Sequence, residues 1–164
     1  MKTLLMLRHA KSSWDDSSLD DHERPLNPRG RRDAPRMGAL LRDTRLTPDV
    51  IITSDAVRAH ATATAVADAS GYRGDIMTEP LLYHASPDAI VAVLKSVSNA
   101  NAKTLMIVGH NPGLEEFVEL MTGESHDLPT AALVQLAVPV AKWRDLTPDT
   151  RATLVALWRP KELV

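Results

Sequence analysis

The sequence predicts an α/β fold in which helices cover both faces of a largely parallel central sheet, a three-layer α/β/α sandwich. Short apolar runs alternate along the chain with segments of helical period, a pattern typical of parallel strands joined by helical crossovers. The 164 residues suffice for one domain with a substantial core. No internal repeat, heptad series or long linker interrupts the alternation. We therefore expect residues 1–164 to form one domain, with two smaller domains as the alternative.

Six short segments are expected to be strands. The first, Thr3–Leu7, is short and apolar and ends at Arg8, as a strand buried on both faces would. The others are Val50–Thr53, Ile76–Thr78, Thr104–Val108, Ala132–Val138 and Thr153–Trp158. The pattern does not give the order of these strands in the sheet.

Four segments show helical signals. The spacing of Ala34, Met37, Leu40 and Leu41 is helical, and Pro35 is acceptable there only in the first turn. An alanine-rich helix is expected over Ala56–Ala69, ending before Gly71. The remaining two helices are expected to begin at Pro87, after the capping residue Ser86, and near Pro112.

The segment Ala10–Arg29 is rich in Ser, Asp and Pro and has no period, so it is expected to be a long loop. Its acidic cluster raises the hypothesis of a calcium or magnesium site; the residues are Asp15, Asp16, Asp20, Asp21, His22 and Glu23. The cluster lacks the alternating spacing and turn glycine of an EF-hand. A solvated acidic loop is therefore the better interpretation, and no metal site is expected.

Composition and charge exclude several classes of protein. The net charge of -2 and the pI near 6.3 argue against nucleic acid as a partner. There are no cysteines, which excludes disulfides, thiolate catalysis and Cys-ligated metal centres. Arg8, His9 and Lys11 interrupt the first apolar run, so neither a signal peptide nor a membrane segment is expected, and the expected location is the cytoplasm. Glycine-rich loops of the Walker and dinucleotide-binding types are also absent.

Polar residues follow three of the expected strands at the point where each strand ends, in LLMLRHA, VIITSDAVRA and TLMIVGHNPG. Because the carboxyl ends of parallel strands meet at one edge of a sheet, these residues are expected to become neighbours. They are Arg8, His9, Ser54, Arg58 and His110, and few acids lie near them in these segments. Each of the two arginines can form bidentate hydrogen bonds to the oxygens of an anion, and two helix N-termini are expected beside them. This arrangement predicts a site for a compact dianion such as phosphate.

Two histidines at a phosphate site indicate chemistry beyond binding. A neutral imidazole can attack phosphorus and form a covalent intermediate. The second histidine, if protonated and fixed, would stabilise charge on the phosphoryl oxygens, and such a donor contributes about 3–4 kcal/mol to lowering the barrier. This reaction needs neither metal nor cofactor.

The motifs LRHAKS, SDAVRA and VGHNPG, in this order and each at a strand end, resemble the histidine phosphatase superfamily, and RPLNPRG at residues 24–30 also matches. The resemblance implies a phosphoglycerate mutase-like fold, with His9 as nucleophile, Arg8 and Arg58 as phosphate ligands and His110 as the second catalytic histidine. Within the superfamily, the length, RHAKSSW, RPLNPRG and GHNPGLEE are similar to the SixA-like branch, the bacterial phosphohistidine phosphatases. That likeness implies phosphohistidine on a signalling protein as the substrate.

One departure from the family pattern concerns the leaving group. Many members have a glutamate after the third strand that protonates a leaving alcohol, whereas here EPLLYHAS places Tyr83 at that position and Glu79 a few residues earlier. A site without this acid favours phosphoramidates or activated esters, because a leaving imidazole is far less basic than an alkoxide. A loop aspartate, namely Asp15, Asp16, Asp20 or Asp21, is the alternative acid.

Further candidates for substrate binding surround the motifs; they are Lys11, Ser12, Arg24, Tyr83 and Asn111. Arg24 is expected either to reach the phosphate or to pair with Asp20 or Asp21, with the ion pair slightly favoured. His60 and His84 are expected to be structural or exposed. Two other functions remain open: a phosphomonoesterase or mutase acting on small metabolites, and a non-catalytic module that binds a phosphorylated ligand.

Overall fold

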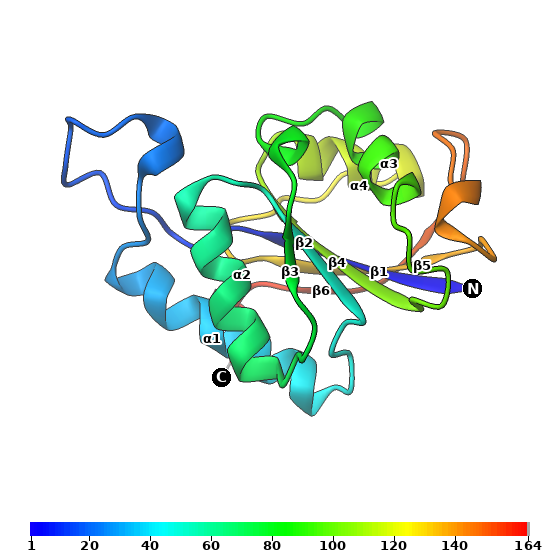
Figure 1. The fold of residues 1–164 in the computed structure, drawn as a ribbon, viewed down its shortest axis with the longest axis horizontal. Coiled ribbons are helices and arrows are strands. Elements are labelled where there is room, and N and C mark those ends of the chain that lie inside the picture. Colours follow the sequence, from blue (N-terminus) through cyan, green and yellow to red (C-terminus); the bar gives the residue numbers. More distant parts are fainter. Residues whose placement is uncertain (164) are drawn as a thin grey trace.

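Six strands form one central sheet in the computed structural model, which describes residues 1–163 (Figure 1). In chain order they are β1 (Lys2–Arg8), β2 (Val50–Thr53), β3 (Ile76–Thr78), β4 (Thr104–Gly109), β5 (Leu133–Val138) and β6 (Thr153–Trp158). Their order in the sheet is β3-β2-β4-β1-β5-β6. The pairs β3–β2, β2–β4 and β4–β1 are parallel, and β5 and β6 pair antiparallel beside them. The expectation of a largely parallel sheet is confirmed.

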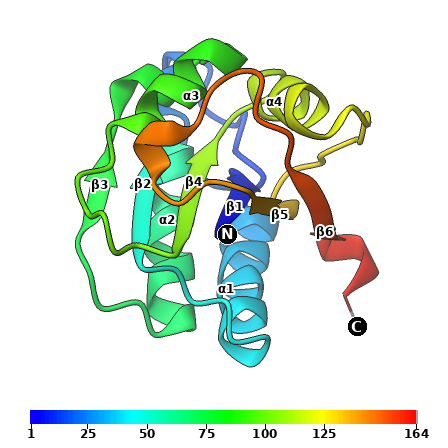
Figure 2. The same ribbon diagram turned by 90° about the vertical axis from the view of Figure 1, so that its right-hand side faces the viewer.

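Four helices cover the two faces of this sheet. They are α1 (Pro28–Asp43), α2 (Val57–Ser70), α3 (Pro87–Lys95) and α4 (Gly113–Thr122). Figures 1 and 2 show α1 and α2 on one side of the sheet and α3 and α4 on the other. The three-layer α/β/α sandwich expected from the sequence is therefore present. Within residues 1–163, no helix has the length and apolar character needed to cross a bilayer.

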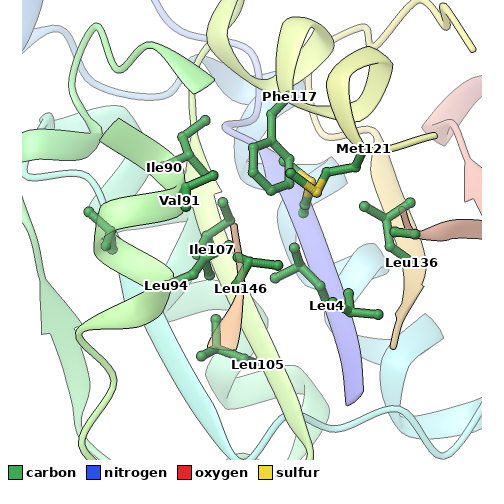
Figure 3. Packing of buried hydrophobic residues seen from close by; sticks show 14 of the residues in the cluster. Leu4, Ile90, Val91, Leu94, Leu105, Ile107, Phe117, Met121, Leu136 and Leu146 are labelled. Carbon is green, nitrogen blue, oxygen red and sulfur yellow. The ribbon is translucent and has the colours of Figure 1, made fainter. Parts of the chain in front are cut away.

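The side chains of β1 alternate between two cores because successive residues of a strand point to opposite faces. Leu4 and Met6 belong to the core beneath α3 and α4, and Leu5 and Leu7 belong to the core beneath α1 and α2. Figure 3 shows the first core, in which Ile90, Leu94, Phe117 and Met121 of the helices pack over Leu4, Leu105 and Ile107 of the strands. The apolar character of this run follows from burial on both faces, which fixes the point at which the strand ends at Arg8.

The region before and within α1 differs from the sequence-based expectation. The helix begins at Pro28 because the Asn27 side chain accepts a hydrogen bond from the Gly30 amide at 2.8 Å, so Arg29 is helical and the loop is shorter than expected. Pro35 lies inside the helix, and its placement in the first turn is therefore wrong. A proline there removes one backbone hydrogen bond. Burial of Ala34 and Met37 against the neighbouring core offsets that loss.

The other helix boundaries lie close to those expected. Gly71 ends α2 in the left-handed conformation, with φ of 80°, where a residue without Cβ is favoured. Ser86 caps α3 by accepting from the Ala89 amide, and Pro87 is its first residue. Pro112 precedes Gly113, the first residue of α4. α2 and α4 consequently begin just beyond the ends of β2 and β4.

Candidate active site

The ends of β1, β2 and β4 lie side by side at one edge of the sheet. The His9 amide donates to the Gly109 carbonyl at 3.0 Å, and the Ser54 amide donates to the Val108 carbonyl at 3.0 Å. These backbone contacts join the three strand ends because β4 lies between β1 and β2. The structure thus brings together Arg8, His9, Ser54, Arg58 and His110, as expected from the parallel sheet.

His9 is fixed with one ring nitrogen directed to the backbone. Its Nδ1 lies 2.8 Å from the Ala10 carbonyl oxygen, which can only accept, so Nδ1 has the proton and Nε2 is unprotonated. Arg58 Nε donates to this Nε2 at 3.4 Å. Burial, together with Arg58 and Arg8, lowers the pKa of His9 to about 4. His9 is therefore a neutral imidazole at neutral pH, and its unprotonated Nε2 accepts a long hydrogen bond from Arg58.

The position of Ala10 depends in turn on α2. The Ala10 amide donates to Thr62 Oγ1 at 3.0 Å, and Thr62 Oγ1 donates to the Arg58 carbonyl at 2.7 Å. Thr62 is fully buried. The same side chain therefore connects the backbone that orients His9 to the backbone of Arg58.

His110 lies beside His9, with 5.1 Å between the ring centroids. Its Nε2 is 2.8 Å from Ser54 Oγ, which already accepts from the Ala56 amide and so has its own hydrogen free to donate. His110 Nδ1 is buried and has no hydrogen-bond partner among residues 1–163. Burial, with His9 and Arg58 nearby, lowers the pKa of His110 to about 3. With no anion bound, the lowered pKa values leave both rings neutral at neutral pH.

The acid that neutralises this cluster comes from the long loop. Asp21 Oδ2 accepts from the Tyr83 hydroxyl at 2.6 Å and from Arg58 at 2.9 Å, and its Oδ1 accepts from Arg24 at 2.8 Å. The Asp21 backbone carbonyl also accepts from Arg58 at 2.6 Å. The Tyr83 hydroxyl, with the two guanidiniums, holds the pKa of Asp21 well below its usual range. Asp21 is therefore an ionised partner of the arginines.

The pocket at this edge has a volume of about 230 Å³. Of the further residues expected to bind substrate, Lys11, Ser12, Arg24 and Asn111 line it. Tyr83 lies outside the lining, where its ring packs edge-on against His110 at 5.3 Å between centroids and its hydroxyl contacts Asp21. Arg24 forms the expected ion pair with Asp21 and also lines the pocket.

Three further residues line the pocket that were not among the candidates for substrate binding, namely Trp14, His84 and Thr130. His84 is exposed, as expected, but lies at the pocket. Thr130 comes from the segment before β5, which no motif marks. The signal for Trp14 was available: it is a large aromatic residue in an otherwise polar loop, five residues after His9.

Carboxylates do not line the pocket in the described part of the chain. Glu79, the acid that the sequence places nearest to the family's glutamate, accepts from the Leu81 amide at 3.0 Å and caps a short 3-10 turn. Among residues 1–163, no group of three or more His, Cys, Asp or Glu side chains is arranged to hold a metal ion.

Comparison with known proteins gives the class of protein. The model of the histidine phosphatase superfamily (branch 1) matches residues 4–83. An uncharacterized chloroplastic protein of Arabidopsis thaliana is 36% identical over 144 residues, which cover 82% of this chain and 66% of that protein. An uncharacterized protein of Mycobacterium leprae is 32% identical over 94% of this chain and 100% of its own length. The chain belongs to the histidine phosphatase superfamily.

Solved structures indicate the branch of the superfamily. The candidate phosphohistidine phosphatase SixA from Agrobacterium tumefaciens is 28% identical, with a TM-score of 0.81 over 97% of this chain and 98% of its own. A second candidate phosphohistidine phosphatase SixA, from Nakamurella multipartitia, is also 28% identical, with a TM-score of 0.82 over 97% of this chain and 96% of its own. A protein histidine phosphatase SixA complexed with tungstate shares the fold at 19% identity, with a TM-score of 0.82. The chain is a phosphatase of the SixA-like branch.

Proposed function

We propose that this phosphatase removes the phosphoryl group from phosphohistidine on a protein, through a covalent intermediate on His9. The observation that supports the proposal best is the state of His9: Nδ1 donates to the Ala10 carbonyl, and the unprotonated Nε2 has only the long contact with Arg58 Nε. The pocket around it contains cations but no carboxylate in the described residues. This combination suits an attack on phosphorus in which the leaving group needs no acid.

In the first step, the lone pair of His9 Nε2 forms a bond to phosphorus while the bond from phosphorus to the leaving imidazole nitrogen breaks. The electron pair of that bond goes to the leaving nitrogen, and with the other ring nitrogen of phosphohistidine protonated the leaving group departs as neutral imidazole. The low pKa of His9 keeps Nε2 unprotonated and available for attack. As Nε2 reaches phosphorus, Arg58 Nε loses its contact with the ring and becomes free to donate to a phosphoryl oxygen.

Charge on the phosphoryl oxygens is stabilised by donors already in place. Arg8 is fixed by donation from Nη1 to the Leu128 carbonyl at 2.9 Å, and its buried Nε has no partner among residues 1–163. His110 Nδ1 is a second buried atom without a partner in that range. Both atoms suit donation to phosphoryl oxygens. A phosphoryl dianion would also raise the pKa of His110, because an opposite charge favours its protonated form.

In the second step, water attacks phosphorus and the bond from phosphorus to His9 Nε2 breaks. The water oxygen becomes part of phosphate, its proton leaves to solvent or to a phosphate oxygen, and Nε2 regains its lone pair. No redox change occurs, and the enzyme returns to its starting state. The leaving group in this step is again an imidazole, which is far less basic than an alkoxide.

The state of Asp21 supports imidazole, and not an alkoxide, as the leaving group. Asp21 is the carboxylate that contacts Arg24, Arg58 and Tyr83, and these contacts hold it ionised. An ionised carboxylate with accepting contacts on both oxygens cannot donate a proton to an alkoxide. The arrangement therefore favours phosphohistidine over alkyl phosphates.

The test is a side-by-side assay of a phosphohistidine protein, a phosphoserine peptide and several sugar phosphates. We expect turnover of the phosphohistidine protein at rates at least about a hundredfold above those of the alkyl phosphates, because removing an acid contributes on that scale. His9→Ala should abolish both turnover and labelling of the enzyme. His60→Ala, a change of an exposed histidine on α2, is the matched control and should leave both intact.

Comparable rates on the sugar phosphates would contradict the substrate class and favour a general phosphomonoesterase. Retention of activity and labelling by His9→Ala would contradict the covalent mechanism. Absence of turnover with phosphate binding intact would favour a binding module.

A further inference from the structure

Trp14 presents an exposed aromatic ring at the phosphate pocket. Trp14 is 72% exposed, yet it lines the same pocket as His9 and Arg58. Large apolar side chains are also exposed at Met1, Val57, Met77, Leu81 and Val155, but none of these lines the pocket. Exposure of a ring at this position leaves apolar surface that a bound molecule can cover.

The Trp14 ring has a fixed support. The Arg24 guanidinium carbon lies 3.2 Å from the ring centroid, in a cation–π contact. Arg24 is itself held by donation to the Ser13 carbonyl at 3.1 Å, to Asp21 at 2.8 Å and to Ser12 Oγ. Arg24 is only 6% exposed, so this support is buried. The indole is therefore held on one face by Arg24, while most of the ring surface faces solvent.

The size of the pocket limits how much of a substrate it can enclose. The pocket volume of about 230 Å³ lies below the range of ~300–1,000 Å³ that is typical of small-molecule sites. The cations and histidines within it match a phosphoryl group and the atoms next to phosphorus. The rest of a substrate extends toward solvent, and the exposed Trp14 is among the residues that line the pocket.

We propose that Trp14 is a specificity-determining residue that stacks on the planar ring of the leaving group. The identity of that ring as the imidazole of phosphohistidine rests on the proposed function; the preference for a planar ring does not. Stacking of one flat ring on another suits an exposed indole with a fixed orientation. Trp14 then selects by the shape of the leaving group, whereas the arginines and histidines select the phosphoryl group.

The experiment compares Trp14→Ala and Trp14→Phe with the unaltered enzyme on three small substrates. Phosphohistidine has an imidazole leaving group, p-nitrophenyl phosphate has an aryl leaving group, and phosphoramidate has no ring. For Trp14→Ala we expect kcat/KM to fall about tenfold on the two ring-bearing substrates, the size of one stacking contact. On phosphoramidate it should stay within about twofold, and Trp14→Phe should retain most of the activity on all three. Leu81→Ala, which removes an exposed apolar side chain outside the pocket, is the control.

An equal fall on phosphoramidate would overturn the inference, because it would mean that Trp14 acts only by holding Arg24. No fall on the ring-bearing substrates would overturn it as well, as would a fall seen with a phosphohistidine protein but not with free phosphohistidine. Failure of the proposed function is distinguishable. If the enzyme does not act on phosphohistidine but shows the Trp14 dependence with p-nitrophenyl phosphate, the ring preference stands and the substrate proposal fails.

Discussion

Arg58 Nε donates to His9 Nε2 at 3.4 Å, while the other two nitrogens of the same guanidinium donate to Asp21. One arginine thus contacts the proposed nucleophile and is held in place by an acid from the loop between β1 and α1. This loop, blue in Figure 1, extends from the carboxyl end of β1. The geometry of the proposed nucleophile therefore depends on the segment between β1 and α1, in which Asp21 begins a short 3-10 helix over Asp21–Glu23.

Replacement of Arg58 by lysine keeps the charge but removes the fixed fork of donors. We expect Arg58→Lys to lower kcat by about a hundredfold, since loss of a preorganised donor to a developing anion has effects of that size. Steady-state kinetics on a phosphohistidine substrate measures the change. Arg73→Lys, at an exposed position before β3, should have no effect. A kcat for Arg58→Lys close to that of the unaltered enzyme would contradict the proposed role.

Replacement of Asp21 by asparagine tests whether this residue positions Arg58 or donates a proton. The amide cannot accept at both positions, so Arg58 and Arg24 lose part of their support and the pocket loses a negative charge. We expect kcat to fall about tenfold on P–N and P–O substrates alike, and phosphate to inhibit at lower concentration. Asp20→Asn, a change of the exposed neighbouring acid, is the control.

If Asp21 instead supplied a proton, Asp21→Asn would impair alkyl phosphates far more than phosphohistidine. A selective loss of that kind, with unchanged inhibition by phosphate, is the outcome that contradicts the positioning role.

Thr62 offers a test of the connection between α2 and His9. Thr62→Val keeps the shape of the side chain but leaves the Ala10 amide without its acceptor. An unsatisfied buried donor costs about 1–3 kcal/mol, so the melting temperature should fall, and kcat should fall with it because Ala10 orients His9. Thr64→Val, on the exposed side of the same helix, should change neither by a comparable amount. Equal behaviour of the two variants in thermal denaturation and kinetics would exclude this connection.

The two buried histidines predict how stability depends on pH. In the unfolded chain they take up protons near pH 6.5, whereas in the folded protein their pKa values are about 4 for His9 and about 3 for His110. Between these limits the unfolded state binds more protons, so the free energy of unfolding decreases as the pH falls below about 6.5. Each histidine contributes a slope of at most about 1.4 kcal/mol per pH unit.

Urea unfolding at pH 7, 6 and 5 measures this dependence. His9→Asn should reduce the slope, while His60→Asn, at an exposed position on α2, should leave it unchanged. A slope that is the same in the unaltered protein and in His9→Asn would show that His9 is not held neutral by the fold.

The sequence alone is sufficient to predict where the strands lie and which residues stand at their ends. β1 is apolar because it is buried on both faces, and this burial determines that charge begins at Arg8. The same reasoning applies to β4 and His110. Boundaries of the helices followed from Gly71, Ser86 and Pro87, because their local conformations do not depend on distant residues. Pro35 was misplaced because packing of α1 against its neighbours outweighed a local preference.

Only the tertiary structure determines the contacts of residues that lie in segments without a periodic pattern. The sequence does not distinguish the four loop aspartates as candidates for an acid at the site. The fold brings Asp21 alone of these four to Arg24, Arg58 and Tyr83, which come from three separate segments of the chain. The neutral state of both histidines likewise depends on burial and on neighbouring cations. Local sequence thus determined which groups reach the sheet edge, whereas their charge and pairing depend on long-range distances that no local pattern encodes.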